Sequence, residues 1–207
     1  LLAGPGSVKQ KSGKGFQMSA TQVICAHMQD STRIDGLPFM KMHGLGNDFV
    51  VIDARDSAVD LTAGLARALA DRHRGVGFDQ LALITGGTDA DVTLTFYNAD
   101  GTFSATCGNA TRCIAQHEMT RQGTTSLTLR TDRGVLQAED AGSGLTRVNM
   151  GQPQLEWRDV PLAVETDTLH LPIAGDPVAT GMGNPHCTFF VEDAEAVDLQ
   201  AFGPTHE

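Results

Sequence analysis

The feature that most constrains the fold is a succession of short apolar segments separated by turn residues, beginning near Phe39. Runs of apolar and β-branched residues of this length, bounded by Gly, Asn and Asp, predict strands. Strands dominate, and there is no steady alternation with helices, which favours an α+β fold over a doubly wound parallel sheet. The predicted strands cover 39–43, 48–53, 79–84, 91–97, 126–131, 134–138, 145–150 and 186–191.

Only two stretches have helical spacing. Thr62 predicts the start of a helix over 62–73, and Gly75 follows its end. A second helix is predicted over 110–122, with Gly123 as its stop. One face of this second helix is shared by Ala110, Cys113, Ile114 and His117.

The chain is long enough for one large or two small domains. Residues 1–36 are rich in Gly, Ser, Lys and Gln and lack the apolar stretch of a signal peptide, so we interpret them as a disordered tail or a gene-model extension. Pro153 and Pro161 mark a loop between domains. We therefore expect an N-terminal domain over 37–152 and a partial C-terminal domain over 153–207.

The composition narrows the choice of partners and compartment. A formal net charge of −10 argues against nucleic acid and anionic membranes, because both need clustered Lys and Arg. No apolar run approaches the roughly 18 residues that span a bilayer. The four cysteines form no C-x-x-C pair and are too sparse for a disulfide scaffold, which favours a reduced, cytoplasmic protein.

A short internal repeat suggests two similar halves. Gly44-Leu45-Gly46-Asn47 and Gly181-Met182-Gly183-Asn184 each precede an apolar strand that ends in an acidic residue. The first repeat is not a dinucleotide-binding fingerprint, because a strand and not a helix follows it, and Phe49 stands where the third glycine would be.

Cys107 is the strongest candidate for chemistry. It lies just before the second predicted helix, where free N–H groups and a partial positive charge lower the pKa of a thiol. The same N–H groups can bind a carboxylate. One segment could thus supply both a thiolate and an anchor for an acidic substrate, although a buried, purely structural Cys107 is an equal alternative from spacing alone.

The other cysteines carry weaker expectations. Cys113, inside the helix, and Cys187, in an apolar strand, are expected to pack in the core, and Cys25 in the tail to be incidental. Cys113 and His117 are four residues apart, but no second ligand pair accompanies them, so no metal site is predicted.

Polar residues gather at the turns around these segments. His43 and His186 flank the two repeats and could tune a thiol or be structural. Turn geometry alone explains asparagine at such places, but several of them also suit a site that binds ammonium and carboxylate groups. The turn asparagines are Asn47, Asn98, Asn109 and Asn184.

Taken in order, four runs over about residues 38–193 closely resemble the diaminopimelate epimerase family. These runs are His43-Gly44-Leu45-Gly46-Asn47-Asp48-Phe49, Gly77-Phe78-Asp79-Gln80, Asn98-Ala99-Asp100-Gly101 with Cys107-Gly108-Asn109, and Gly183-Asn184-Pro185-His186. The resemblance implies two pseudo-symmetric α+β domains, each a curved sheet around a central helix, with the site in the cleft between them and the second domain incomplete here.

The resemblance also implies an activity. Members interconvert LL- and meso-diaminopimelate for lysine and peptidoglycan synthesis, using a thiolate and a thiol on opposite faces of the α-carbon, with no pyridoxal phosphate, no metal and no other cofactor. Cys107 corresponds to one catalytic thiol, and His186 to the residue that tunes the thiols. The implied substrate contacts are Asn47, Gln80, Asn98, Gly108, Asn109 and Asn184. A homodimer is compatible with the resemblance.

Two departures from the family pattern are modest, and one is large. Ala110 stands where the family commonly has Gly, and Thr102-Phe103 where it often has Ser-Glu. The family's second Cys-Gly-Thr motif and the preceding Glu-Arg pair are missing from these 207 residues. Sixty residues separate Asn47 from Cys107, and the same spacing from Asn184 reaches about position 244. We therefore expect this chain to be an inactive fragment by itself.

Three alternatives remain open at this point. The chain could belong to a racemase or epimerase of the same fold that acts on another amino acid, such as a proline racemase-like protein. It could be a non-catalytic remnant that binds amino acids through its turns. It could also be a thiol acyl-transfer enzyme that uses Cys107 with a histidine base.

Overall fold

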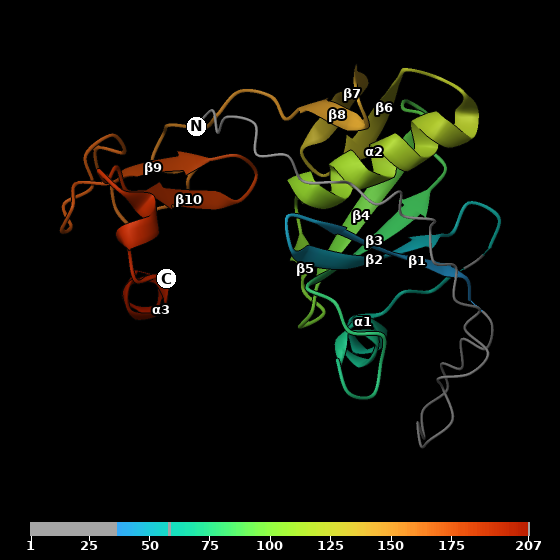
Figure 1. The fold of residues 1–207 in the computed structure, drawn as a ribbon, viewed down its shortest axis with the longest axis horizontal. Coiled ribbons are helices and arrows are strands. Elements are labelled where there is room, and N and C mark those ends of the chain that lie inside the picture. The colour runs from blue at the N-terminus through green and yellow to red at the C-terminus, as the bar shows by residue number, and fades with distance from the viewer. Residues whose placement is uncertain (1–36, 58, 207) are drawn as a thin grey trace. The chain divides into compact units, whose positions relative to one another are not determined.

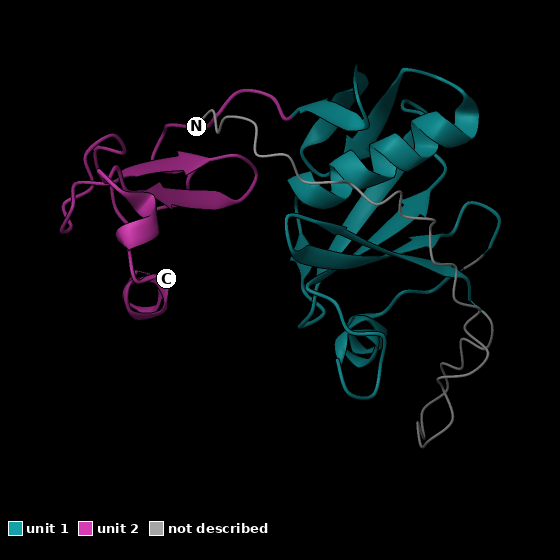
Figure 2. Ribbon diagram, in the orientation of Figure 1, with its two compact units in different colours: residues 1–149 teal, residues 150–207 magenta. Residues whose placement is uncertain are grey.

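A computed structural model describes residues 37–57 and 59–206 of the 207-residue chain. It divides into two compact units, one ending at Asn149 and the other beginning at Met150 (Figure 2). The predicted tail over 1–36, with Cys25, lies outside the described residues.

The first unit is built on an eight-stranded mixed sheet (Figure 1). The strand order is β1-β2-β3-β4-β6-β7-β8, and β5 pairs with β4. The pairs β2–β3 and β4–β6 are parallel, and the others are antiparallel. The strands are β1 (Phe39–Gly44), β2 (Asn47–Asp53), β3 (Gln80–Thr85), β4 (Val92–Asn98), β5 (Phe103–Ser104), β6 (Ser126–Thr131), β7 (Gly134–Gly142) and β8 (Leu145–Asn149).

This architecture confirms the predicted α+β class, with strands dominant and helices few. The predicted strands of this unit agree with the observed ones to within a residue or so at most ends. Two differences stand out: β7 runs on to Gly142 because β8 pairs with it through a bulge, and the two-residue strand β5 was not predicted.

The first Gly-x-Gly-Asn segment closes the β1–β2 hairpin. Gly44 pairs with Asn47, so Leu45 and Gly46 alone form the loop. Both have positive φ, 56° and 90°, as the tightest hairpin turns require. Gly46 adopts this conformation without strain, whereas Leu45 pays for its Cβ.

Alternate residues along the central strands face two separate cores. On one face, Phe49, Ala82 and Phe96 pack with the helix α2 (Gly108–Gln122). On the other face, Val50, Leu81 and Tyr97 pack with the helix α1 (Ala63–Ala70). The sheet is therefore covered on both sides, and α2 lies across one face of it (Figure 1). This two-sided burial explains why the central strands have apolar residues in succession.

Both helices begin and end within about three residues of the bounds that the capping residues predicted. Thr62 caps α1 by accepting a hydrogen bond from the backbone N–H of Leu65. The helix ends at Ala70, three residues before the predicted end. Cys107 is the N-cap of α2, and Gly123, in the left-handed conformation with φ 68°, ends it.

The second unit has little regular structure. A two-stranded sheet pairs β9 (Val178–Gly181) with β10 (Pro185–Thr188). Three short helical turns follow, η2 (Ala194–Ala196), α3 (Leu199–Phe202) and η3 (Gly203–Thr205). The predicted strand over 186–191 was too long, and β9 was not predicted. Cys187 was expected in a core but is exposed, because no layer covers β10 within this unit.

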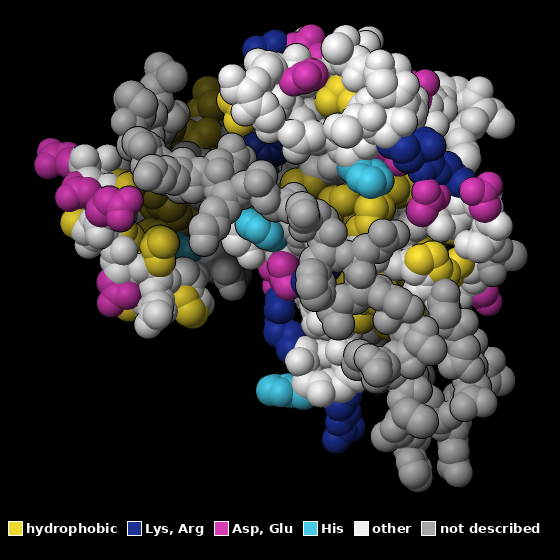
Figure 3. Space-filling view, turned by 45° about the vertical axis from the view of Figure 1, so that its right-hand side comes forward, with side chains coloured by type: hydrophobic (Ala, Val, Ile, Leu, Met, Phe, Trp, Pro, Cys, Tyr) yellow, Lys and Arg dark blue, Asp and Glu magenta, His cyan; other side chains and the backbone are white. Residues whose placement is uncertain are grey.

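The described surface gives no sign of a membrane span. None of the helices in residues 37–57 and 59–206 is long and apolar enough to cross a bilayer. On the face drawn in Figure 3, side chains of both charges are scattered among neutral ones.

Candidate active site

Three strand ends meet at one edge of the first sheet. Phe49 of β2 lies beside Gln80 of β3 in parallel register, and Gln80 pairs with Asn98 of β4 in antiparallel register. The starts of β2 and β3 and the end of β4 therefore share this edge. The edge brings together three of the predicted site residues from separate segments: Asn47, Gln80 and Asn98.

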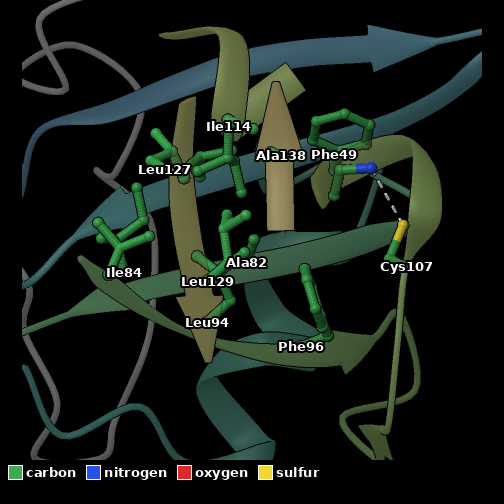
Figure 4. Packing of buried hydrophobic residues seen from close by; sticks show 14 of the residues in the cluster. Phe49, Ala82, Ile84, Leu94, Phe96, Cys107, Ile114, Leu127, Leu129 and Ala138 are labelled. Carbon is green, nitrogen blue, oxygen red and sulfur yellow. Dashed lines mark hydrogen bonds between the residues drawn. The ribbon is translucent and has the colours of Figure 1, made fainter. Parts of the chain in front are cut away.

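Cys107 joins this edge at the start of α2. Its Sγ accepts a hydrogen bond from the backbone N–H of Ala110, at 3.4 Å, drawn as the dashed line in Figure 4. Its carbonyl oxygen accepts from the Thr111 backbone at 2.9 Å and from the Thr111 hydroxyl at 2.8 Å. The thiol thus occupies the capping position that Ser, Thr or Asp usually fills.

The expected direction of the Cys107 pKa was wrong. Burial raises the pKa of the Cys107 thiol, and the N–H groups of Ala110 and Asn109 lower it by less. The side chain is only 7% exposed and packs with Phe49 and Phe96 (Figure 4). The helix-terminus effect is therefore present as predicted, but removal of water from around the sulfur outweighs it.

The Asn47 amide contacts the thiol, and further amide side chains lie at the same edge of the sheet. Asn47 Oδ1 lies 3.7 Å from Cys107 Sγ and 3.4 Å from Asn109 Nδ2, which donates to it. Gln80 Nε2 donates to Asn98 Oδ1 at 3.1 Å. These neutral donors and acceptors suit a zwitterionic ligand, because they can pair with ammonium or carboxylate without adding charge.

Of the remaining predicted site residues, Gly108 is the first residue of α2, and the other two lie in the second unit. Asn184 is in the loop between β9 and β10, and His186 is in β10. His186 Nε2 lies 3.1 Å from Asn184 Oδ1, and both side chains are exposed. These two residues form a pair of their own, described within their unit.

Cys113 and its neighbours do not form a metal site. Cys113 is partly buried against the core, as expected, and its Sγ lies 3.6 Å from the His43 carbonyl oxygen. In the part of the chain that the structure describes, no group of three or more His, Cys, Asp or Glu could hold a metal ion.

A charged cluster beside Asn47 was missed from the sequence. Arg72 donates to both Asp48, at 2.7 and 3.0 Å, and Asp79, at 2.8 Å. Lys41 donates to Asp48 at 2.7 Å. The hydrogen bonds from Arg72 and Lys41 hold the pKa of Asp48 well below its usual range, although burial opposes them. Asp79 belongs to the Gly77-Phe78-Asp79-Gln80 run, which was the available signal.

The cluster borders an open hollow of about 470 Å³. Gly46 and His43 of the first hairpin also line it. The turn before Asn47 therefore has a polar, charge-balanced neighbour on its solvent side.

A buried carboxylate holds the far end of α2 and was also missed. Glu118 is 0% exposed and accepts two hydrogen bonds from Arg55, at 2.8 and 2.9 Å, and others from Arg121 and Gln122. Burial raises its pKa, but the hydrogen bonds more than offset this and leave it at about 2. Glu118 follows Ala110 and Ile114 at four-residue spacing, so helical periodicity already placed it on the buried face.

The fold and the site together define an α+β protein with a thiol at a helix start among amide side chains, an arrangement suited to acid–base chemistry on a small polar molecule. A sequence model of diaminopimelate epimerase matches residues 39–156. The diaminopimelate epimerase of Acidiphilium cryptum is 49% identical over 174 residues, which are 82% of this chain and 63% of that protein.

That of Rhodospirillum centenum is 47% identical over 175 residues, 82% of this chain and 60% of that protein. The chain belongs to the diaminopimelate epimerase family. It spans about three fifths of the length of these curated relatives. A solved hydroxyproline epimerase from Agrobacterium vitis aligns with 80% of this chain and 52% of its own at 15% identity and a TM-score of 0.47, which adds nothing to the assignment.

Proposed function

We propose that this chain forms part of an enzyme that interconverts LL- and meso-diaminopimelate, in lysine and peptidoglycan synthesis, without pyridoxal phosphate or a metal. Membership of the diaminopimelate epimerase family supports the reaction class. The observation that carries the proposal is Cys107 as N-cap of α2, beside Asn47 and Asn109 at the edge where Gln80 and Asn98 also lie.

The chemistry demands two groups of opposite protonation state. A thiolate takes the α-proton, so the C–H bond breaks, an S–H bond forms, and the electron pair stays on the α-carbon. A thiol on the other face then gives up its proton, so its S–H bond breaks and a new C–H bond forms with inverted configuration. Each turnover leaves the two sulfurs with exchanged protonation states.

The site must stabilise the charge that develops on the substrate. No electron sink takes part in this reaction, so N–H donors held in place before the reaction must do so. The first turn of α2 offers such donors beside Cys107, and in our proposal Gly108 and Asn109 bind the substrate carboxylate there. Asn47, Gln80 and Asn98 then hold the polar groups of the same ligand.

The second thiol is proposed to come from outside these 207 residues. Cys113 lies on the same helix as Cys107 and faces the His43 carbonyl, so it cannot approach the opposite face of one α-carbon. Cys187 is part of the β9–β10 hairpin, next to His186. We assign Asn184 to substrate contact and His186 to tuning of the thiols, by the match of their run to the family.

The test uses a version extended at its C-terminus to the length of the relatives, compared with the 207-residue chain. In heavy water, the extended protein is expected to exchange the α-proton of LL- and meso-diaminopimelate. Activity should survive exhaustive chelation and disappear on thiol alkylation. The 207-residue chain should show no conversion.

Three outcomes would overturn the proposal. One is measurable conversion by the 207-residue chain alone, which would contradict the two-thiol argument. Another is loss of activity to a chelator with recovery on adding metal. The third is exchange of another amino acid, from a small panel that includes proline, in place of diaminopimelate, which would identify a relative of different specificity.

A further inference from the structure

Asp79 is held rigidly between a buried anchor and its backbone partner. The preceding residue, Phe78, is buried in the core beneath α1. The backbone N–H of Asp79 donates to the carbonyl oxygen of Asp48 at 2.9 Å and to its Oδ1 at 3.1 Å. The following residue, Gln80, begins β3. The backbone at Asp79 therefore has little freedom, and its carboxylate leaves the chain at a fixed point.

The two oxygens of this carboxylate have different partners. Oδ1 accepts from Arg72 at 2.8 Å. Oδ2 accepts from Asn47 Nδ2 at 3.2 Å and from the Asp48 backbone N–H at 3.1 Å. An ionised carboxylate can only accept, so the nitrogen end of the Asn47 amide must face Asp79. The hydrogen-bond partners thus determine which end of the Asn47 amide faces Asp79.

The other end of the same amide faces the thiol. With its nitrogen turned to Asp79, Asn47 presents Oδ1 to Cys107 Sγ, at 3.7 Å, and to Asn109 Nδ2, at 3.4 Å. An amide oxygen can accept a hydrogen bond from S–H but repels a thiolate. A reversed amide would instead offer N–H to the sulfur and favour the charged form.

We propose that Asp79 is a positioning residue that locks the Asn47 amide with its oxygen toward Cys107 and thereby holds this sulfur as the thiol in the absence of substrate. The inference rests on the proposed function, because it decides which member of a thiol–thiolate pair begins protonated. On this view Cys107 starts as the proton donor, and the opposite sulfur starts as the base.

The influence of other charged groups on Cys107 must be distinguished from the influence of the Asn47 amide. On α2, Arg112 favours the thiolate and Cys113 disfavours it. On the strand side, His43 and Lys41 belong to β1. The rest of the charged cluster beside Asn47 consists of Asp48, Arg72 and Asp79. Loss of any negative charge there would by itself favour the thiolate, so a test must distinguish charge from amide orientation.

The test is the rate at which iodoacetamide alkylates Cys107 in the 207-residue chain, measured from pH 6 to pH 10. Tryptic cleavage after Arg74 and Arg112 leaves Cys107 as the only cysteine of the 75–112 peptide, so its reaction is read separately from that of Cys113. Asp79→Ala frees the Asn47 amide to turn. We expect alkylation at pH 7 to be about threefold faster, a tenfold gain in thiolate offset by the weaker nucleophilicity of a more acidic thiol.

Two matched variants separate orientation from charge. Asp48→Asn removes one negative charge from the same cluster and keeps the Asp79–Asn47 hydrogen bond, so it should change the rate much less. In an Asn47→Ala background, Asp79→Ala should have no further effect, since there is no amide left to orient. If Asp79→Ala does not unfold cooperatively, Asp79→Ser, which keeps a polar group beside the Asp48 N–H, takes its place.

Either of two results would overturn the inference. One is an equal acceleration by Asp48→Asn, and the other is an Asp79→Ala effect that persists without Asn47. Both would assign the effect to charge alone. The readout involves no substrate, so its failure leaves the proposed epimerisation standing, and a lack of epimerisation in the extended protein would not change the alkylation rates.

Discussion

The two hairpins that carry the Gly-x-Gly-Asn pattern differ in what surrounds them. β1–β2 belongs to the large sheet, which α2 covers on one face and α1 on the other, so Phe49, Val50 and Val51 are all buried. β9–β10 is a sheet of two strands, and every residue of β10 is exposed. The same four-residue pattern thus gives a hairpin in both places, but only the first is part of a core.

The exposed apolar side chains show the same contrast. In the second unit, Val160 and Ala179 are the hydrophobic residues buried among those described. Seven of the eleven exposed large hydrophobic residues lie there, and Phe190 is 79% exposed. A two-stranded sheet alone cannot cover such side chains, so burial in this protein is decided by what packs on a strand and not by its sequence.

The largest expected effect is on the epimerisation rate, and it separates one cysteine of the first unit from one cysteine of the second. In the extended protein, Cys107→Ala should lower the epimerisation rate by about 10³-fold or more, because a general acid–base group is removed. Cys187→Ala, on the exposed strand, should leave the rate nearly unchanged. Steady-state kinetics with diaminopimelate measure both, and circular dichroism checks the fold. Wild-type turnover by Cys107→Ala would contradict the site.

A second comparison sets a buried carboxylate against an exposed one. Glu118→Gln removes the buried carboxylate that pairs with both Arg55 and Arg121, and leaves Arg55 with Asp53 alone. It should lower the free energy of unfolding by about 3 kcal/mol, because the carboxylate is fully buried. Glu139→Gln breaks an exposed pair with Arg147 and should have little effect. Urea unfolding of the 207-residue chain measures both. Equal effects would mean that Glu118 is not a buried anchor of α2.

The same carboxylate makes stability depend on acid pH. Its pKa is lowered from 4.5 to about 2 in the folded state, so the fold favours the charged form. This stabilisation is fully present above pH 4.5 and is lost as the pH falls toward 2. As the pH is lowered from 4.5 to 2, the melting temperature should fall more steeply for the wild type than for Glu118→Gln. Parallel curves would show that other carboxylates dominate.

The rates of chemical labelling should distinguish the exposed thiol of the second unit from the buried thiol of the first, without any measurement of catalysis. A bulky maleimide at pH 7 should label exposed Cys187 at least about tenfold faster than Cys107, because Cys107 is buried and its pKa is raised. Mass spectrometry of tryptic peptides distinguishes the two sites, since Arg158 separates them. Equal labelling in the folded chain would place Cys107 outside the core.

The smallest effect should come from the two turns. Leu45 has φ 56° and is 92% exposed, so Leu45→Asn should relieve strain and raise the free energy of unfolding by about 0.5 kcal/mol. Met182 is the corresponding residue of the second hairpin and does not have a positive φ, so Met182→Asn should bring no gain. Urea unfolding of both variants tests this, and a gain from both would mean that the turns share one geometry.

Local signals in the sequence determined much of the first unit. Alternating apolar residues predicted its strands, Thr62 and Gly123 marked helix ends, and the turn at Leu45 and Gly46 was anticipated. The motif runs named Cys107, Asn47, Gln80 and Asn98, and the structure brings these four to one edge of the sheet. Such features depend on residues close in the chain, which is why the sequence alone shows them.

Only the tertiary structure decided the properties that depend on distant residues. Burial raised the pKa of Cys107 against the helix-terminus effect, because the core cluster that includes Phe49 and Phe96 removes water from around the sulfur. The Asp79–Asn47 and Arg55–Glu118 contacts join residues 32 and 63 positions apart. Cys187 looked like a core residue by its neighbours, yet it is exposed. Whether an apolar strand is buried, and which way a polar side chain points, depends on the surfaces that fold against it, and local patterns do not contain that information.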